Sequence, residues 1–173
     1  MSVEATQLHE EMEQARAHFA ALVAGASPKA LRRRSNGTRW TNRQLLFHMV
    51  FGYLVVLRLL PLVRYFGRQP DWSSRRFSAV LDAVTPPYHV VNYLGSVGGG
   101  QVLTPTAMVR LLDRTVSALH HHLASEQHGA LARSMYFPVR WDPYFQETMT
   151  LTDVYHFGTL HFQHHARQLT LDA

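Results

Sequence analysis

The sequence contains no cysteine. Disulfide bonds and metal sites built on thiolates are therefore excluded, and the absence is compatible with a reducing cytoplasm. No apolar run is long and unbroken enough for a membrane span, because the longest one is interrupted by His48, Arg58 and Pro61. The first residues are acidic and amphipathic, unlike a signal peptide. We therefore expect a cytoplasmic protein without a membrane partner.

Charged residues are also scarce, at 17% of the chain against 46% hydrophobic residues. This balance is typical of a compact globular protein, and 173 residues suffice for a single domain over 1–173 with a real core. The formal net charge is +5, but the arginines are scattered and no nucleic-acid motif accompanies them. The charge therefore favours an ordinary solvated surface over binding of nucleic acid or of an anionic substrate.

Any regular alternation of strands and helices is missing as well, which argues against α/β folds. Apolar residues instead recur at three- and four-residue spacing in four segments. The pattern predicts an all-α protein, an antiparallel four-helix bundle with long irregular insertions after the second and third helices. The four predicted helices cover approximately residues 4–23, 41–61, 104–123 and 150–169.

Capping residues and breakers mark the limits of these helices. Thr41 and Thr150 each begin a capping pattern, and Pro61 is expected to kink or end the second helix. The insertion 69–103 is expected to hold a short helix, a strand-like run and a flexible loop at the triple glycine 98–100. Residues 129–149 are expected to be loop and extended chain.

Histidine is what the sequence has in excess, with 12 residues. His161 and His165 are four positions apart, which places both imidazoles on one helix face where they can share a divalent ion. His48 lies on the apolar stripe of the second predicted helix and is the best third ligand. The alternatives are that His48 is a hydrogen-bonded core residue and that His161 and His165 merely share a face.

Five further residues near these histidines have two interpretations each. Gly52 and Gly158 either leave room for a substrate beside a metal or allow two helices to pack closely. His164 either supports the site or lies in solvent. Arg167 and Gln168 can steer an anionic group or orient a ligand imidazole, and Arg167 equally suits a surface position in the last helical turn.

Two stretches of the chain resemble the DinB/YfiT-like metalloenzyme superfamily. One is the tryptophan-led helix start WTNRQLLFHMV, residues 40–50, and the other is HFQHHARQL, residues 161–169, close to the ending H-x-x-H-H-x-x-Q-[IL]. The order and spacing of the motifs extend the likeness over nearly the whole chain. The resemblance implies a four-helix bundle, often dimeric, that binds zinc or nickel through His48, His161 and His165.

The resemblance also implies a chemistry. Relatives include transferases and isomerases that use a low-molecular-weight thiol, and iron-dependent sulfoxide synthases with the motif H-x-x-x-H-x-E. Here Arg167 replaces that glutamate, which argues against the iron chemistry. We therefore expect a metal-dependent enzyme that activates a thiol cosubstrate, and secondarily water as in a hydrolase, for attack on a small electrophilic substrate. The alternatives are a metal-binding stress or regulatory module without catalysis and a metal-free small-molecule binder.

Overall fold

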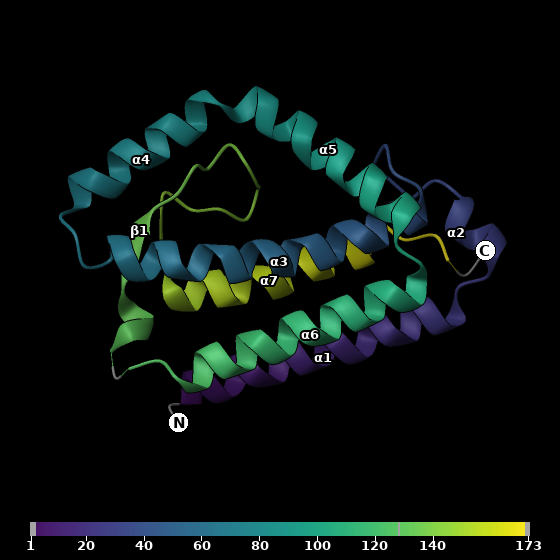
Figure 1. Ribbon diagram of the computed structural model, residues 1–173, viewed down its shortest axis with the longest axis horizontal. Coiled ribbons are helices and arrows are strands. Elements are labelled where there is room, and N and C mark those ends of the chain that lie inside the picture. The colour runs from purple at the N-terminus through teal and green to yellow at the C-terminus, as the bar shows by residue number, and fades with distance from the viewer. Residues whose placement is uncertain (1–2, 128, 172–173) are drawn as a thin grey trace.

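The computed structural model describes residues 3–127 and 129–171, and these residues are mostly helical (Figure 1). The prediction of an all-α protein is therefore confirmed. The only strands in the described ranges are two short antiparallel ones that pair Ser134 with Thr150. The helices are α1 (Val3–Gly25), α2 (Pro28–Arg32), α3 (Asn42–Phe66), α4 (Asp71–Ala83), α5 (Thr85–Val102), α6 (Pro105–Ala124) and α7 (Leu151–Ala166), and the strands are β1 (Ser134–Tyr136) and β2 (Thr148–Thr150).

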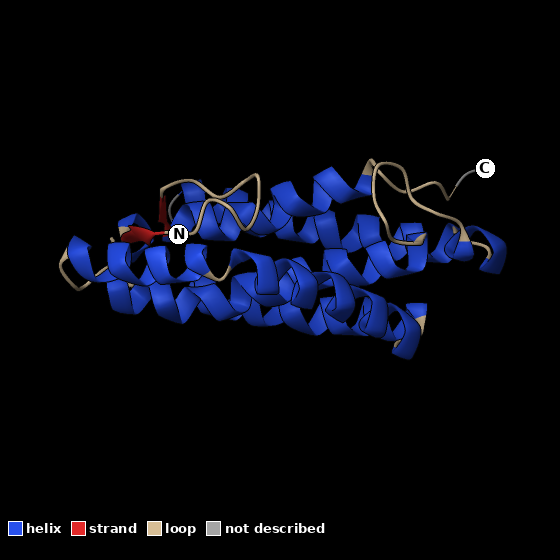
Figure 2. Ribbon diagram, turned by 90° about the horizontal axis from the view of Figure 1, so that it is seen from above, coloured by secondary structure: helices blue, strands red, loops and turns tan. Residues whose placement is uncertain are grey.

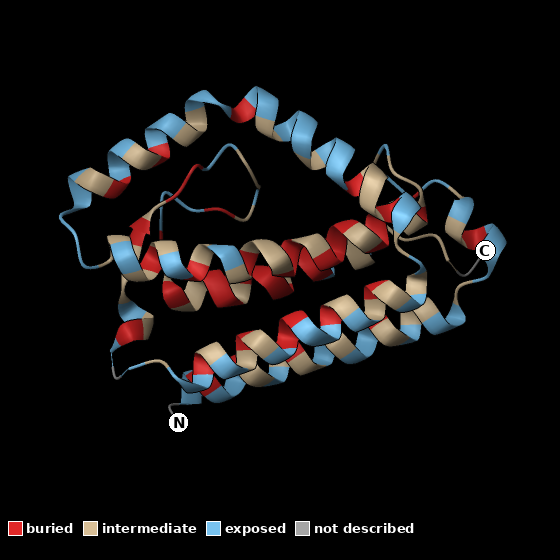
Figure 3. Ribbon diagram, in the orientation of Figure 1, coloured by how far each residue is buried: buried red, intermediate tan, exposed pale blue. Residues whose placement is uncertain are grey.

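Four long helices, α1, α3, α6 and α7, lie side by side along the long axis of the molecule (Figures 1 and 2). Helix α3 packs against α7 and α6, and α1 packs against α6 and α7. The core lies between them, because the buried residues of each helix face its neighbours (Figure 3). Helix α5 crosses over α3 and covers the end of α3 that carries His48.

The helix starts follow from their capping residues. Thr41 and Gln44 form a reciprocal capping box at α3, and Thr150 and Asp153 form another at α7. Each box satisfies backbone N–H groups that the first helical turn leaves without a partner. The two helices that carry the candidate histidines therefore begin where the sequence predicts.

Helix α3 does not end at Pro61, so of the two outcomes predicted there, termination is wrong. The helix continues to Phe66. Proline costs about 3 kcal/mol inside a helix, but Leu60 and Val63 on either side are fully buried and hold the next turn against the core. By length and composition alone, α3 could also cross a membrane. Core helices of soluble proteins meet the same criteria, so this composition is only weak evidence for a membrane span.

The segment 69–103 forms α4 and α5. The short helix predicted there is confirmed by α4, whereas the predicted strand-like run and flexible loop are wrong, because both belong to α5. The triple glycine belongs to the last turns of α5, and two of its members, Gly99 and Gly100, pack against α3. A Cβ atom at Gly100 would lie 2.7 Å from the Cα atom of Gln44, and one at Gly99 would lie 2.2 Å from the ring of Phe47. Glycine is needed here for close approach of two helices, not for flexibility. Residues 129–149 hold one turn of 3-10 helix, Ala130–Ala132, and the strands β1 and β2.

Candidate metal centre

The structure brings His48, His161 and His165 together between α3 and α7. One ring nitrogen of each lies within 4.8 Å of one ring nitrogen of the other two. His48 is 5% exposed and His161 is 4% exposed, while His165 is partly buried. His48 lies on the buried face of α3, and the four-residue spacing places His161 and His165 on one face of α7. Three imidazoles distant in sequence therefore face one point.

The outer partners of two imidazoles fix which nitrogen carries the lone pair. Ser96 donates its hydroxyl hydrogen to the carbonyl oxygen of Asn92, so its Oγ accepts a hydrogen bond from Nδ1 of His48 at 3.0 Å. Nδ1 of His165 donates to Oε1 of Gln168 at 2.7 Å. Both histidines therefore keep the Nε2 lone pair free for a cation.

The spacing of the nitrogens suits a small divalent ion. Two nitrogens that each lie about 2.0–2.1 Å from a tetrahedral zinc ion are roughly 3.3 Å apart. The Nε2 atoms of His48 and His161 are 3.2 Å apart. Without a proton or a cation between them, two lone pairs at this distance would repel each other. The three residues therefore fit a divalent cation.

The protonation of the three imidazoles suits the same role. Burial, with the neighbouring His165, lowers the pKa of His48 to about 3, and burial lowers the pKa of His165 to about 4. Burial and the neighbouring imidazoles also lower the pKa of His161 well below its usual value. All three rings are therefore neutral near pH 7 and can each offer a lone pair to a metal.

Aromatic rings and a backbone clamp hold the site. The ring of Trp40 lies 4.4 Å from that of His48 and 6.3 Å from that of His165, centroid to centroid. The carbonyl oxygen of Gln168 accepts a hydrogen bond from the backbone N–H of Asn36 at 2.8 Å. Trp40 and Gln168, one from each motif of the sequence, therefore position the imidazoles from outside.

The two glycines support close packing rather than open space. A Cβ atom at Gly52 would lie 2.3 Å from Nδ1 of His161, and one at Gly158 would lie 2.9 Å from the ring of Tyr53. Nδ1 of His161 is buried and has no hydrogen-bond partner among the described residues. The position of this imidazole is thus set by the shape of α3 at Gly52.

The remaining predicted residues lie at the edge of the site or outside it. Nδ1 of His164 and the hydroxyl of Tyr144 share a hydrogen bond of 3.2 Å, and the ring of His164 contacts that of His165. Arg167 is exposed at the C-terminal end of α7, as the surface interpretation predicts. Another histidine of α7, His156, pairs with Glu11 at 2.7 Å, away from the three histidines.

Asp142 is a polar neighbour of the site that sequence reasoning missed. Its Oδ2 lies 3.9 Å from Nε2 of His161, and its Oδ1 accepts the backbone N–H of Tyr144 at 2.9 Å. Burial raises the pKa of this carboxyl group. The loop 137–147 brings it to the site, and no spacing along the chain relates it to the histidines. Ser96 and Asn92 were missed because α5 was not predicted.

Three cavities meet the site or adjoin it. A small one reaches His48, His161, Asn92 and Asp142. A second one, of about 330 Å³, adjoins His165, and Arg39 and His89 are among the residues that line it. A third, of about 430 Å³, is apolar and shares walls with the small one.

Comparison with known proteins agrees with the two motifs. The DinB superfamily matches residues 11–169, a range that includes His48, His161 and His165. No curated protein and no solved structure matches the chain significantly. The match covers most of the chain and confirms the resemblance. The chain therefore belongs to the DinB superfamily.

Proposed function

We propose that this protein binds one divalent metal ion, zinc or nickel, through the Nε2 atoms of His48, His161 and His165, and uses it as an enzyme. The observation that carries the proposal is the convergence of three neutral imidazoles. Hydrogen bonds at Nδ1 of His48 and of His165 leave Nε2 of these two rings free. The packing of α1, α3, α6 and α7 supports the antiparallel four-helix bundle that the family resemblance implies.

The reaction we propose is attack by an activated thiol, or secondarily by water, on a small electrophile. A divalent cation held by three neutral imidazoles keeps its double charge and lowers the pKa of a bound water or thiol. Asp142 lies beside Nε2 of His161 and can accept a hydrogen bond from the incoming nucleophile at Oδ2. The amide oxygen of Asn92 is buried without a partner among the described residues and can accept another.

A thiol must come from a cosubstrate, because the chain has no cysteine. The cavity beside His165 supports entry of such a molecule, since Arg39 and His89 in its lining are suited to the carboxylates of a low-molecular-weight thiol. The apolar cavity lies on the other side, toward His161 and Asp142. Thiol and electrophile would then reach the histidines from different directions.

Metal analysis tests the first part of the proposal. Protein purified without a histidine tag should carry close to one zinc or nickel ion per chain by plasma mass spectrometry. His48→Ala and His161→Ala should lose it. His156→Ala is the matched control on α7 and should keep it, because His156 pairs with Glu11. Folded protein that binds no metal would contradict the proposal and favour the metal-free binder.

Cobalt substitution separates an open catalytic site from a closed structural one. The visible spectrum of the Co²⁺ protein should change on titration with 2-mercaptoethanol, because a thiolate adds a strong charge-transfer band when it coordinates. Ethanol at the same concentrations is the control and should leave the spectrum unchanged. Metal binding without any thiol response would contradict thiol activation and favour a metal-binding module without catalysis.

A further inference from the structure

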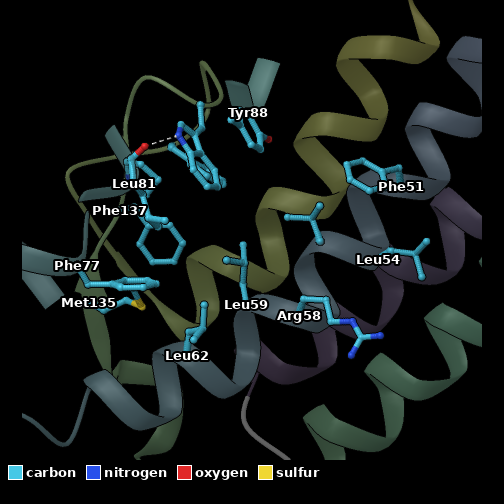
Figure 4. Close-up of a pocket in the computed structure, with 14 residues that line it drawn as sticks. Phe51, Leu54, Arg58, Leu59, Leu62, Phe77, Leu81, Tyr88, Met135 and Phe137 are labelled. Carbon is cyan, nitrogen blue, oxygen red and sulfur yellow. Dashed lines mark hydrogen bonds between the residues drawn. The ribbon is translucent and has the colours of Figure 1, made fainter. Parts of the chain in front are cut away.

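An apolar cavity beside α3 contains none of the three candidate metal ligands. Its volume is about 430 Å³, within the range of roughly 300–1,000 Å³ usual for small-molecule sites. Residues from α3, α4, α5 and β1 and from the loop after β1 line it (Figure 4). Six of the 14 lining residues are aromatic: Phe51, Phe77, Tyr88, Phe137, Trp141 and Phe145.

This apolar cavity shares part of its lining with the small cavity at the histidines. Phe51, Val55, Tyr88 and Phe145 line both. A ligand that fills the apolar cavity would therefore have one end at the small cavity, where His161 and Asp142 lie.

The polar groups of the lining limit what the ligand can be. Trp141 stacks on Tyr88, with ring centroids 3.9 Å apart, and its indole N–H donates to the carbonyl oxygen of Leu81 at 3.0 Å (dashed in Figure 4). That donor is therefore already used. Arg58 is the only charged residue among those that line the cavity, and its side chain is exposed. The interior thus offers no charge to bind an ionic ligand.

One lining group remains available for a polar contact. The hydroxyl of Tyr88 has no hydrogen-bond partner within the described ranges. Tyr88 lies in the wall that the two cavities share. Burial, with the nearby carboxylate of Asp142, raises the pKa of this phenol to about 12, so the hydroxyl keeps its hydrogen at neutral pH. It is a donor at the junction between the apolar cavity and the histidines.

We propose that the apolar cavity binds the body of the substrate, an uncharged carbonyl compound with an aromatic or branched aliphatic body, and that Tyr88 donates a hydrogen bond to its carbonyl oxygen. The assignment of this ligand as the substrate rests on the proposed function, whereas binding in the cavity does not. The apolar lining selects the body, and the single free donor orients the carbonyl group toward the small cavity.

Binding of 4-fluoroacetophenone, followed by ¹⁹F NMR, tests the proposal. We expect saturable binding to the protein, with 4-fluoroethylbenzene bound more weakly because it lacks the carbonyl oxygen. Tyr88→Phe should weaken binding of the ketone several-fold and leave 4-fluoroethylbenzene unchanged. Equal loss of both probes would overturn the role of Tyr88, since a merely structural effect would not discriminate between them.

Two cavity-filling variants test the location. Val55→Phe at the common wall and Leu62→Phe at another part of the lining should each weaken ketone binding about tenfold or more. Val91→Phe, at a position of α5 that is 67% exposed, is the matched control and should bind like the unmodified protein. Circular dichroism checks folding of each variant. Unchanged binding in both folded filling variants would place the probe elsewhere and overturn the proposal.

The metal requirement is tested separately. His48→Ala should lose metal yet still bind 4-fluoroacetophenone, because His48 does not line the apolar cavity. In protein loaded with Co²⁺, relaxation of the bound ¹⁹F nucleus should be faster than in the zinc form. Ketone binding without metal binding would refute only the proposed function. Metal binding without ketone binding would refute only this inference.

Discussion

Gly52 has more influence on the metal centre than its lack of a side chain suggests. The imidazole of His161 occupies the space that a Cβ atom at this position would need. Since the interior is closely packed, the ring cannot yield without losing its direction toward His48. A glycine on one helix thus sets the orientation of a histidine on another.

Gly52→Ala should therefore lower zinc affinity at least tenfold while the protein stays folded. The added methyl group would lie 2.3 Å from Nδ1 of His161, which forces the ring to rotate. Competition with a chromogenic chelator measures the affinity. Gly95→Ala is the control, because nothing lies within 4 Å of a Cβ atom there. Equal zinc affinities in both variants would show that His161 is free to adjust.

The side chain of Gln168 accepts a hydrogen bond from Nδ1 of His165. Removing a hydrogen-bond partner of a metal-binding imidazole typically costs 10- to 100-fold in affinity. We expect Gln168→Leu to reduce zinc affinity by about that factor, measured by the same chelator competition. Gln163→Leu changes an exposed glutamine of α7 and should have no effect. A loss of the same size in Gln163→Leu would point to helix stability instead of the hydrogen bond.

At the scale of elements, the helices whose apolar faces meet the core and the short helix α4 could be predicted from sequence, whereas α5 could not. Periodicity and the capping boxes at Thr41 and Thr150 identify α3 and α7 and hence the three histidines. Helix α5 carries two prolines in its first turn and three glycines near its end, residues that favour turns when judged locally. The packing of α5 on α3 overrides that preference. Neither this packing nor the position of Asp142 beside His161 is indicated by the sequence around those residues.

Gly100→Ala tests whether this helix pair depends on close approach. A Cβ atom would lie 2.7 Å from the Cα atom of Gln44, where backbone must move. We expect the free energy of unfolding to fall by about 1–3 kcal/mol, the usual cost of overpacking, as measured by urea denaturation. Gly98→Ala, with open space around it, should be neutral or slightly stabilising because alanine favours helix. Equal stabilities of the two variants would mean that α5 can move away from α3 without loss.

For the whole molecule, the depressed histidine pKa values link folding to pH. In the metal-free protein the native state resists protonation of His48 and His165 until about pH 3 and pH 4, whereas the unfolded chain takes up protons below about pH 6.5. The unfolded state thus binds more protons between these values, so stability is complete above pH 6.5 and is lost as the pH falls.

Urea unfolding in the presence of a chelator should accordingly show lower stability at pH 5 than at pH 7. Each of these histidines contributes at most about 1.4 kcal/mol per pH unit. His165→Gln should have a shallower dependence, because it removes one of the titrating groups. A pH dependence that is identical in His165→Gln and the unmodified protein would contradict neutral burial of this imidazole in the native state.

Trp141 and Asp142 are adjacent in the chain but belong to different cavities. The indole forms part of the apolar wall, and the carboxylate lies beside Nε2 of His161. A molecule that shifts the indole would therefore act on the carboxylate through a single peptide unit. Thermodynamic linkage would make this effect mutual. If such a molecule changes the affinity for a cation at the histidines by some factor, the cation changes the affinity for the molecule by the same factor.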